Sequence, residues 1–247
     1  GGTSSGKTYS LMQLLFVLGM SEPRQVITVV GQDVPNLKKG AYRDAKTILA
    51  SSVVLQQWWP YVNEGERIIR CTNGSLIEFT SYKDGQDAKS GKRDYLFINE
   101  ANGISYEIYW QLAIRTRKKI FIDYNPAAVF WAMEKVEVKE NCILLVTTYL
   151  DNAEFLSPEQ IAEIEANRHD RNWWQVYGEG KVGTLEGLIY DFEQIDEMPE
   201  PDGLRETWGI DFGFTHDPTA IVRVLADTGR KVAYVDEIAY STGMMNG

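Results

Sequence analysis

The sequence predicts an α/β fold in which helices cover a mostly parallel β-sheet. A glycine-rich loop at residues 1–8 leads directly into a segment of helical composition. Short runs rich in β-branched residues then alternate with helical segments over residues 25–147, a pattern typical of parallel sheets. The 247 residues are 44% hydrophobic and 24% charged, without a low-complexity stretch, as in ordinary globular proteins.

The first eight residues fit the phosphate-loop pattern G-x-x-x-x-G-K-[ST], with Gly1, Gly6, Lys7 and Thr8 at its fixed positions. The glycines, together with Thr3, Ser4 and Ser5, would turn their backbone N–H groups toward phosphate oxygens. Lysine neutralises the β- and γ-phosphates, and the threonine hydroxyl binds Mg²⁺. The loop therefore predicts a site for ATP and Mg²⁺. Such a loop normally follows a buried strand, so we expect one before Gly1 in a longer protein.

The next elements up to residue 81 are predicted from local patterns. Residues 8–20 have helical composition, and residues 25–30 form a β-branched run typical of a buried strand. Residues 37–54 predict one amphipathic helix with a solvent-facing basic side. The runs at 67–71 and 75–81 flank Asn73-Gly74, which predicts a hairpin with a type I′ turn and positive φ at both residues.

Strands are also expected at residues 94–99, 119–123 and 142–147, and helices at 105–118 and 158–167. An acidic, proline-bearing stretch then precedes three more strand-like runs, at 207–211, 219–225 and 231–238. We therefore expect one domain over residues 1–180, a linker over 181–204 and the beginning of a second domain over 205–247.

Polar residues follow two of the predicted strands, at the sheet edge where ligands bind in parallel α/β folds. Glu100 is the candidate general base that orients and deprotonates an attacking water. Asn99 stands where an aspartate is usual, and its amide keeps an acceptor oxygen but brings no charge. Asn125 is a candidate sensor of the γ-phosphate, or begins a turn with Pro126.

Composition excludes some classes of protein and leaves others open. No apolar run reaches the roughly 18 residues needed to span a bilayer, two histidines exclude a histidine-rich metal site, and two distant cysteines indicate free thiols. The net charge is −10, but the acidity is concentrated in residues 151–205 while residues 1–150 are slightly basic. This balance neither excludes nor supports a nucleic-acid partner.

These blocks, in this order, resemble the large terminase subunit of tailed bacteriophages. The matching segments are residues 1–8, 97–102 (Phe-Ile-Asn-Glu-Ala-Asn), 123–126 (Asp-Tyr-Asn-Pro), 147–152 (Thr-Thr-Tyr-Leu-Asp-Asn), 174–180 and 208–214. The resemblance covers essentially the whole chain. Its phosphate-loop motif is generic, whereas Asn-Glu-Ala-Asn at 99–102 and Gly-Ile-Asp-Phe-Gly at 209–213 are more discriminating.

The resemblance implies an additional-strand, RecA-like P-loop NTPase domain that drives double-stranded DNA into a procapsid. It implies that a ribonuclease-H-like nuclease domain follows, with a two-metal site for Mg²⁺ or Mn²⁺. Asp211 matches the first metal-binding aspartate of that domain, and the remaining carboxylates are expected beyond residue 247. We therefore expect no DNA cleavage by residues 1–247 alone. The implied partners are a small terminase subunit, the portal of the procapsid and further copies in a ring, in the host cytoplasm and without a membrane.

Two other functions remain open from the residues: another P-loop DNA motor such as a helicase, and a nucleotide-binding structural subunit without turnover, which the neutral Asn99 makes conceivable. The sequence also leaves open which arginine or lysine stabilises the transition state of ATP hydrolysis. The candidates are Lys89, Lys92, Arg93, Arg115 and Arg117, although a residue of this kind is more often a solvated surface charge.

Overall fold

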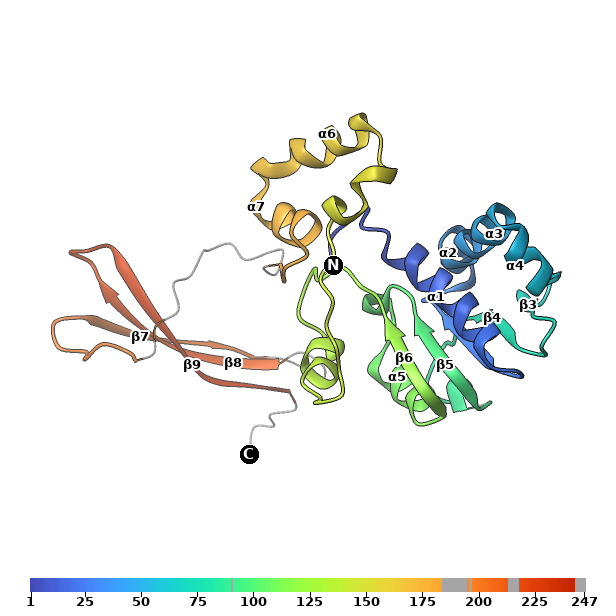
Figure 1. Cartoon of the computed structure of the whole chain (residues 1–247). Helices are drawn as coiled ribbons and strands as arrows, with labels where there is room; N and C mark the ends of the chain where they lie inside the picture. The colour runs from blue at the N-terminus through green and yellow to red at the C-terminus, as the bar shows by residue number, and fades with distance from the viewer. Residues whose placement is uncertain (90, 184–194, 196, 213–217, 243–247) are drawn as a thin grey trace. The chain divides into compact units, whose positions relative to one another are not determined.

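The computed structural model describes residues 1–89, 91–183, 195, 197–212 and 218–242. The chain divides into two compact units, residues 1–186 and 187–247, and this division falls inside the linker expected at residues 181–204. Figure 1 shows the first unit in blue to yellow and the second in orange and red.

The first unit contains a six-stranded sheet with the order β2-β3-β4-β1-β5-β6. Its strands are β1 (Val26–Val30), β2 (Tyr61–Asn63), β3 (Ile68–Arg70), β4 (Leu76–Thr80), β5 (Arg93–Ile98) and β6 (Thr116–Ile122). β4, β1, β5 and β6 are parallel, and β2 and β3 add an antiparallel edge. The α/β prediction with a parallel sheet is therefore confirmed.

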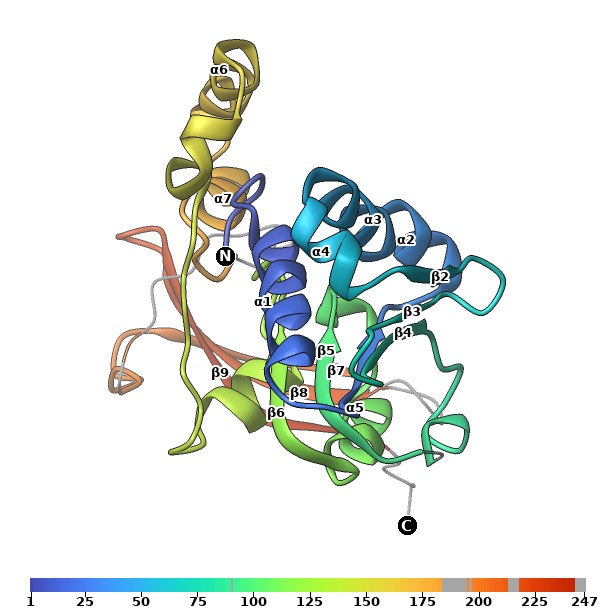
Figure 2. The same ribbon diagram turned by 45° about the vertical axis from the view of Figure 1, so that its right-hand side comes forward.

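The helices of this unit are α1 (Lys7–Ser21), α2 (Val34–Lys39), α3 (Ala41–Ser51), α4 (Val53–Trp58), α5 (Tyr106–Ala113), α6 (Pro158–Ala166) and α7 (Arg171–Trp173). Short helical turns are η1 (Asp87–Lys89), η2 (Ala101–Gly103), η3 (Met133–Glu137), η4 (Tyr149–Phe155), η5 (Asn167–His169) and η6 (Trp174–Gly178). Residues 149–178 form a helical lobe above the sheet in Figure 2.

The strand β5 is central because every one of its residues is buried. Successive side chains of a strand point to opposite faces. Accordingly, Tyr95 and Phe97 join a core beneath α1 and α3, whereas Leu96 and Ile98 join a second core beneath α5. Helices thus cover both faces of the sheet, with the carboxyl ends of its parallel strands along one edge.

Two predicted helices end earlier than the sequence suggested. The single helix expected at 37–54 is wrong: Gly40 (φ −106°, ψ −115°) and Ser52 interrupt it, giving α2, α3 and α4. Ser52 caps the new helix by accepting a hydrogen bond from the N–H of Leu55. The helix expected at 105–118 ends at Ala113, because the chain from Thr116 pairs with β5 as strand β6.

The type I′ turn predicted at Asn73-Gly74 is also wrong, although the antiparallel pair β3–β4 is present. Only Gly74 has a positive φ, of 87°. The N–H of Gly74 donates to the carbonyl of Cys71 over 3.1 Å, and the N–H of Cys71 donates to the carbonyl of Ser75 over 2.8 Å. This is a three-residue hairpin loop with glycine in the left-handed position.

Residues 142–147 do not form the strand that their composition predicts. They run as an extended segment toward the helical lobe (Figure 2). Ile143 and Leu145 are 86% and 77% exposed. The described sheet ends at β6, and no described strand lies between β6 and residues 142–147. The backbone of residues 142–147 therefore has no strand to pair with.

The second unit contains an antiparallel meander of β7 (Arg205–Asp211), β8 (Pro218–Asp227) and β9 (Val232–Thr242). These strands confirm the three runs expected from the sequence. In the described part of this unit, only Leu225 and Thr219 are buried. Across the described residues of the chain, no helix has the length and apolar character needed to cross a membrane.

Candidate nucleotide-binding site

The loop at residues 1–8 has the backbone of an anion-binding nest. Ser4 and Gly6 adopt left-handed conformations, with φ of 50° and 71°. Within the described structure, no protein group accepts a hydrogen bond from the backbone N–H of Ser4, Ser5 or Gly6. These donors precede the N-terminus of the 15-residue helix α1, where the helix dipole favours negative charge. The loop therefore suits a phosphate group.

Other parts of the same unit fix this loop from outside. The N–H of Gly2 donates to the carbonyl of Thr147 over 2.7 Å, and the N–H of Thr3 donates to that of Tyr177 over 2.8 Å. The Asn152 side chain donates from Nδ2 to the carbonyl of Ser4 over 3.0 Å. Since the N–H groups of Gly2 and Thr3 are engaged in this way, the phosphate-facing donors begin at Ser4.

Lys7 lies folded over the loop, where its ammonium group has four oxygen neighbours. The short contacts join Nζ to the carbonyl of Gly2 (2.6 Å) and to Oδ1 of Asn125 (3.0 Å); those to the Gly1 carbonyl and Ser5 Oγ are 3.4 Å. Burial lowers the pKa of Lys7, while the nearby negative charges of Asp123 and Glu100 act to raise that pKa. An anionic ligand would stabilise the same charge.

The carboxyl ends of β5 and β6 meet at Thr8, the first residue after Lys7 on α1. Thr8 Oγ1 donates to Asp123 Oδ2 over 2.6 Å. Asn99 Nδ2 lies 3.1 Å from Asp123 Oδ1 and 3.3 Å from both Asp123 Oδ2 and Thr8 Oγ1. Asn99 and Asp123 are 6% and 4% exposed. Three elements thus converge on one buried cluster of polar groups.

Glu100 follows Asn99 at the exit of β5, and its side chain is exposed. Its backbone is left-handed, with φ 54° and ψ 58°, and its N–H donates to Asp123 Oδ1 over 2.6 Å. A non-glycine residue with positive φ is uncommon and costs about 1 kcal/mol or more. The bend directs the chain away from the sheet and leaves the Glu100 carboxylate in solvent at the strand end, where water can reach it.

Asn125 contacts both the loop and the segment after β5. Its Oδ1 accepts from Lys7, and its carbonyl accepts from Asn102 Nδ2 over 2.9 Å and from the N–H of Ala127 over 2.8 Å. The two roles considered for Asn125 are therefore compatible: its backbone makes a turn while its side chain contacts Lys7.

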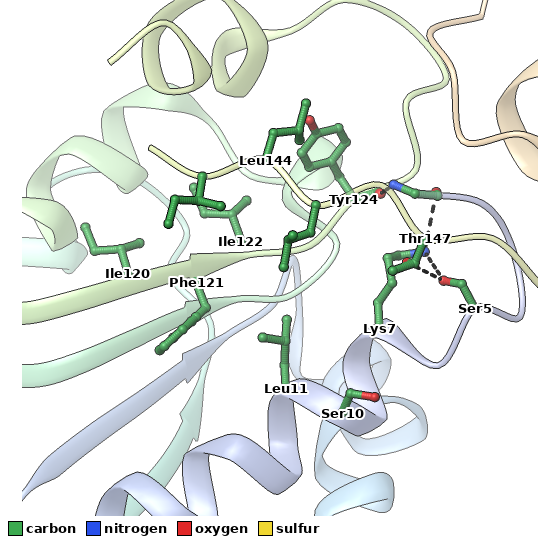
Figure 3. Close-up of a pocket in the computed structure, with 13 residues that line it drawn as sticks. Ser5, Lys7, Ser10, Leu11, Ile120, Phe121, Ile122, Tyr124, Leu144 and Thr147 are labelled. Atoms are coloured by element: carbon green, nitrogen blue, oxygen red, sulfur yellow. Dashed lines mark hydrogen bonds between the residues drawn. The ribbon is translucent and has the colours of Figure 1, made fainter. Parts of the chain in front are cut away.

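A cavity of about 300 Å³ extends from the loop along the free edge of β6 (Figure 3). Lys7, Ser5, Ser10 and Thr147 line its polar end. Its apolar part is lined by Leu11, Ile120, Phe121, Ile122, Ile143, Leu144 and Leu145. The cavity therefore lies between β6 and residues 143–147, with the phosphate loop at its polar end.

Sequence reasoning missed three residues of this site: Asp123, Thr147 and Asn152. Each lies in a segment that carries the family resemblance, which was the available signal. The 3₁₀ helix η4 begins with a capping box, in which Thr148 and Asp151 bond each other's backbone N–H groups. This cap fixes the start of η4 and so the direction of Asn152 toward Ser4.

The three arginine candidates do not lie at the phosphate loop. Arg93, Arg115 and Arg117 lie at the amino ends of β5 and β6, roughly 20 Å from the carboxyl ends at about 3.3 Å per residue. Arg93 is 2% exposed and donates from Nε to Thr28 Oγ1 over 3.1 Å. None of these three arginines therefore contacts the phosphate loop.

Asp211 belongs to the second unit, where it ends β7 and is exposed. Asp217, another carboxylate of the same segment, lies outside the described residues. The described residues contain no group of three histidine, cysteine, aspartate or glutamate side chains that could hold a metal ion. The metal role of Asp211 stays a prediction.

A glycine-rich loop before a helix, with Lys7 and Thr8 turned toward the strand ends of a parallel sheet, defines the P-loop NTPase class of fold. Within that class, the chain belongs to the phage terminase large subunit family, whose model, described as "Phage terminase large subunit", matches residues 1–181. The search of curated proteins found no match.

Solved structures agree with this fold assignment. The large terminase of a thermophilic bacteriophage in complex with ADP matches with a TM-score of 0.62 and 20% identity, over 96% of this chain and 62% of that one. The large terminase of bacteriophage HK97 matches with a TM-score of 0.56 and 13% identity, over 96% and 57%. The ATPase domain of the Thermus phage P74-26 large terminase gives 0.50 and 14%, over 71% and 84%. The chain spans about three fifths of the length of the thermophilic bacteriophage protein.

Proposed function

We propose that this chain is the ATP-hydrolysing motor subunit of a phage terminase, which translocates double-stranded DNA into a procapsid. The observation that carries the proposal is the convergence of Lys7, Thr8 and the ends of β5 and β6 at one loop with free N–H groups. Membership of the terminase large subunit family supports it, as do the ADP- and ATP-γ-S-bound structures of the large terminase from the thermophilic bacteriophage.

Nucleotide phosphates would bind at the donors of Ser4, Ser5 and Gly6 and at Lys7. An ammonium group has three protons to donate, and in the described structure Lys7 uses them on Gly2, Asn125 and the rest of the loop. Phosphate oxygens would compete for these protons, which frees the side chain of Asn125. Asn125 can then respond to the γ-phosphate and relay its presence through Asn102.

The residues beside the loop also fit Mg²⁺, because Thr8 offers a hydroxyl oxygen and Asp123 a buried carboxylate within 2.6 Å of it. Mg²⁺ prefers a small number of protein oxygens together with phosphates and water. When bound, the ion would neutralise the charge of the β- and γ-phosphates. Glu100 orients the attacking water and accepts its proton, since its carboxylate is open to solvent beside the strand end.

The wider assembly is part of the same proposal. The partners are double-stranded DNA, the terminase small subunit, the portal of the procapsid and further copies of this chain in a ring. Residues from 205 onward would begin the metal-dependent endonuclease, with Asp211 as one ligand of Mg²⁺ or Mn²⁺. Because one carboxylate cannot hold two metals, purified residues 1–247 should not nick plasmid DNA. Metal-dependent nicking that is lost on Asp211→Ala would contradict this part.

The test of the motor function is Glu100→Gln, which keeps the size and polarity of the side chain but removes the base. We expect phosphate release to fall by about 10²–10⁴-fold, while binding of a fluorescent ATP analogue stays near the wild-type value. Glu107→Gln, on α5, is the matched control and should hydrolyse ATP normally. A Glu100→Gln variant with normal turnover would refute the assigned base.

The same assay separates the two other functions. Wild-type protein that binds ATP but releases no phosphate, even with DNA and partners present, would indicate a structural subunit without turnover. Strand separation on a forked duplex would favour a helicase. Stimulation of the ATPase by a small subunit or procapsid would favour packaging.

A further inference from the structure

In the buried polar cluster of Thr8, Asn99 and Asp123, the neutral Asn99 stands where an aspartate is usual. Asn99 ends β5 beside the phosphate loop, yet it brings no negative charge to a cation. Its amide nitrogen, rather than its oxygen, must face Asp123, because a buried carboxylate accepts hydrogen bonds and the nitrogen contacts both of its oxygens at 3.1 and 3.3 Å. Asn99 therefore acts as a donor that holds a carboxylate.

That carboxylate belongs to the neighbouring strand β6. Asp123 pairs with the end of β5 through its backbone, since its N–H donates to Ile98 over 3.0 Å and its carbonyl accepts from Ala101 over 2.9 Å. Its side chain accepts from the N–H of Glu100 at one oxygen and from Thr8 at the other. A side chain that is 4% exposed is thus fixed on both oxygens by three residues.

The orientation of the Thr8 hydroxyl follows from these contacts. The hydroxyl gives its proton to Asp123 and accepts one from Asn99. A hydroxyl has one proton and two lone pairs, so one lone pair of Thr8 Oγ1 remains for a cation. The neighbouring charge is that of Asp123.

We propose that Asp123 supplies the negative charge of the Mg²⁺ site, and that Asn99 and Thr8 are positioned around this carboxylate. The charge normally carried at the end of β5 has moved to the end of β6. This inference rests on the proposed function, because it requires a nucleotide–Mg²⁺ complex at the loop. It also explains how a site with Asn99 can bind Mg²⁺.

The test measures how much Mg²⁺ strengthens nucleotide binding, using a fluorescent ADP titrated with and without Mg²⁺ in the full chain. We expect Asp123→Asn to keep Mg²⁺-free binding but to lose most of the strengthening by Mg²⁺, about tenfold or more, because a charge-assisted contact is lost. The double variant Asn99→Asp/Asp123→Asn returns the charge to β5 and should regain part of that strengthening.

Asp94→Asn is the matched control. Asp94 is as buried as Asp123, at 4% exposed, but it lies at the amino end of β5, away from the phosphate loop. This variant should leave the Mg²⁺ dependence unchanged. Asn99→Asp adds a second carboxylate and should strengthen the Mg²⁺ dependence. If Asp123→Asn does not fold, Asn99→Asp and the double variant still test the inference. Electron paramagnetic resonance of Mn²⁺ in the presence of ADP gives a readout independent of turnover.

Two outcomes would overturn the inference: an Asp123→Asn protein with wild-type Mg²⁺ dependence, or wild-type binding of ADP that Mg²⁺ does not change. A wild-type chain that binds no nucleotide at all would instead refute the proposed function. The two failures are therefore distinguishable in one titration series.

Discussion

Two aspartates at strand ends, Asp123 in the first unit and Asp211 in the second, illustrate how the two units differ. Asp123 is 4% exposed and accepts hydrogen bonds from three residues on two other segments. Asp211 is exposed at the end of β7, and the described residues place no metal-binding group of three around it. Of these two aspartates, only Asp123 is surrounded by hydrogen-bonding partners within the described structure.

The first unit also buries more of its apolar side chains than the second. In the first unit, two apolar cores lie on opposite faces of the six-stranded sheet. In the second, the described strands expose large apolar side chains, among them Trp208, Ile210 and Tyr240, at 53%, 55% and 63%. Apolar burial is the main favourable contribution to folding, so the first unit should carry most of the measurable stability.

The largest predicted effect compares two tryptophans. Trp59 is 1% exposed and packs edge-to-face against Phe16 with centroids 5.3 Å apart, beneath Gly19 of α1. Trp59→Ala should lower the free energy of unfolding by about 3–5 kcal/mol, because it leaves a large cavity. Trp208→Ala should change it by no more than about 0.5 kcal/mol. Urea unfolding followed by circular dichroism measures both.

Trp59→Phe is the control that separates packing from hydrogen bonding. The indole N–H of Trp59 is buried without an acceptor among the described residues, and burying an unpaired donor is unfavourable. Phenylalanine removes that donor while filling most of the space, so its cost should be far below that of alanine. Equal losses for Trp59→Ala and Trp208→Ala would contradict the contrast between the units.

The next prediction concerns nucleotide affinity. Lys7→Ala removes the lysine ammonium group that lies over the loop and should weaken binding of fluorescent ADP by about 100-fold, as expected for lost charge-assisted bonds. Asp211→Ala should leave that affinity unchanged, since Asp211 belongs to the other unit. An effect of Asp211→Ala on ADP binding would show that the units are coupled at the nucleotide site.

Much of the first unit could be predicted from the sequence because its signals are local. The glycine loop, the β-branched run of β1 and the apolar centre of β5 each specify an element without knowledge of their neighbours. The start of α6 is also specified locally, because Ser157 caps it by accepting a hydrogen bond from the N–H of Gln160. The positions of Lys7, Thr8 and Glu100 follow from such elements.

The failures depend on neighbours that a local pattern does not show. Residues 142–147 have strand composition, but a strand needs a partner for its ladder, and the described sheet ends at β6. The end of α5 is set by pairing between β5 and β6 rather than by helix propensity. Asp123 was missed as a site residue for the same reason, since its role arises from Thr8 and Asn99, which are distant in sequence.

The smallest predicted effect is a pH dependence that again compares the units. Glu165 accepts hydrogen bonds from Arg168 and from Tyr149, and these bonds lower the pKa of its carboxyl from 4.5 to about 2. Because the folded-state pKa lies below the unfolded one, the carboxylate stabilises the fold fully above about pH 4.5, and this contribution is lost as the pH falls toward 2. Removing the carboxylate should therefore matter at neutral pH and not in acid.

Glu165→Gln should lower the melting temperature by a few degrees or less at about pH 7 and by nothing measurable near pH 2, as for a partly exposed ion pair. Glu206→Gln is the matched variant in the second unit, where the bonds from Arg223 and Trp208 also lower the pKa of the carboxyl. Its effect should be smaller, because Tyr149 beside Glu165 is 1% exposed, whereas Trp208 beside Glu206 is 53% exposed. A larger loss for Glu206→Gln, or a loss for Glu165→Gln that grows toward acid pH, would contradict the view that the first unit holds its polar groups more firmly.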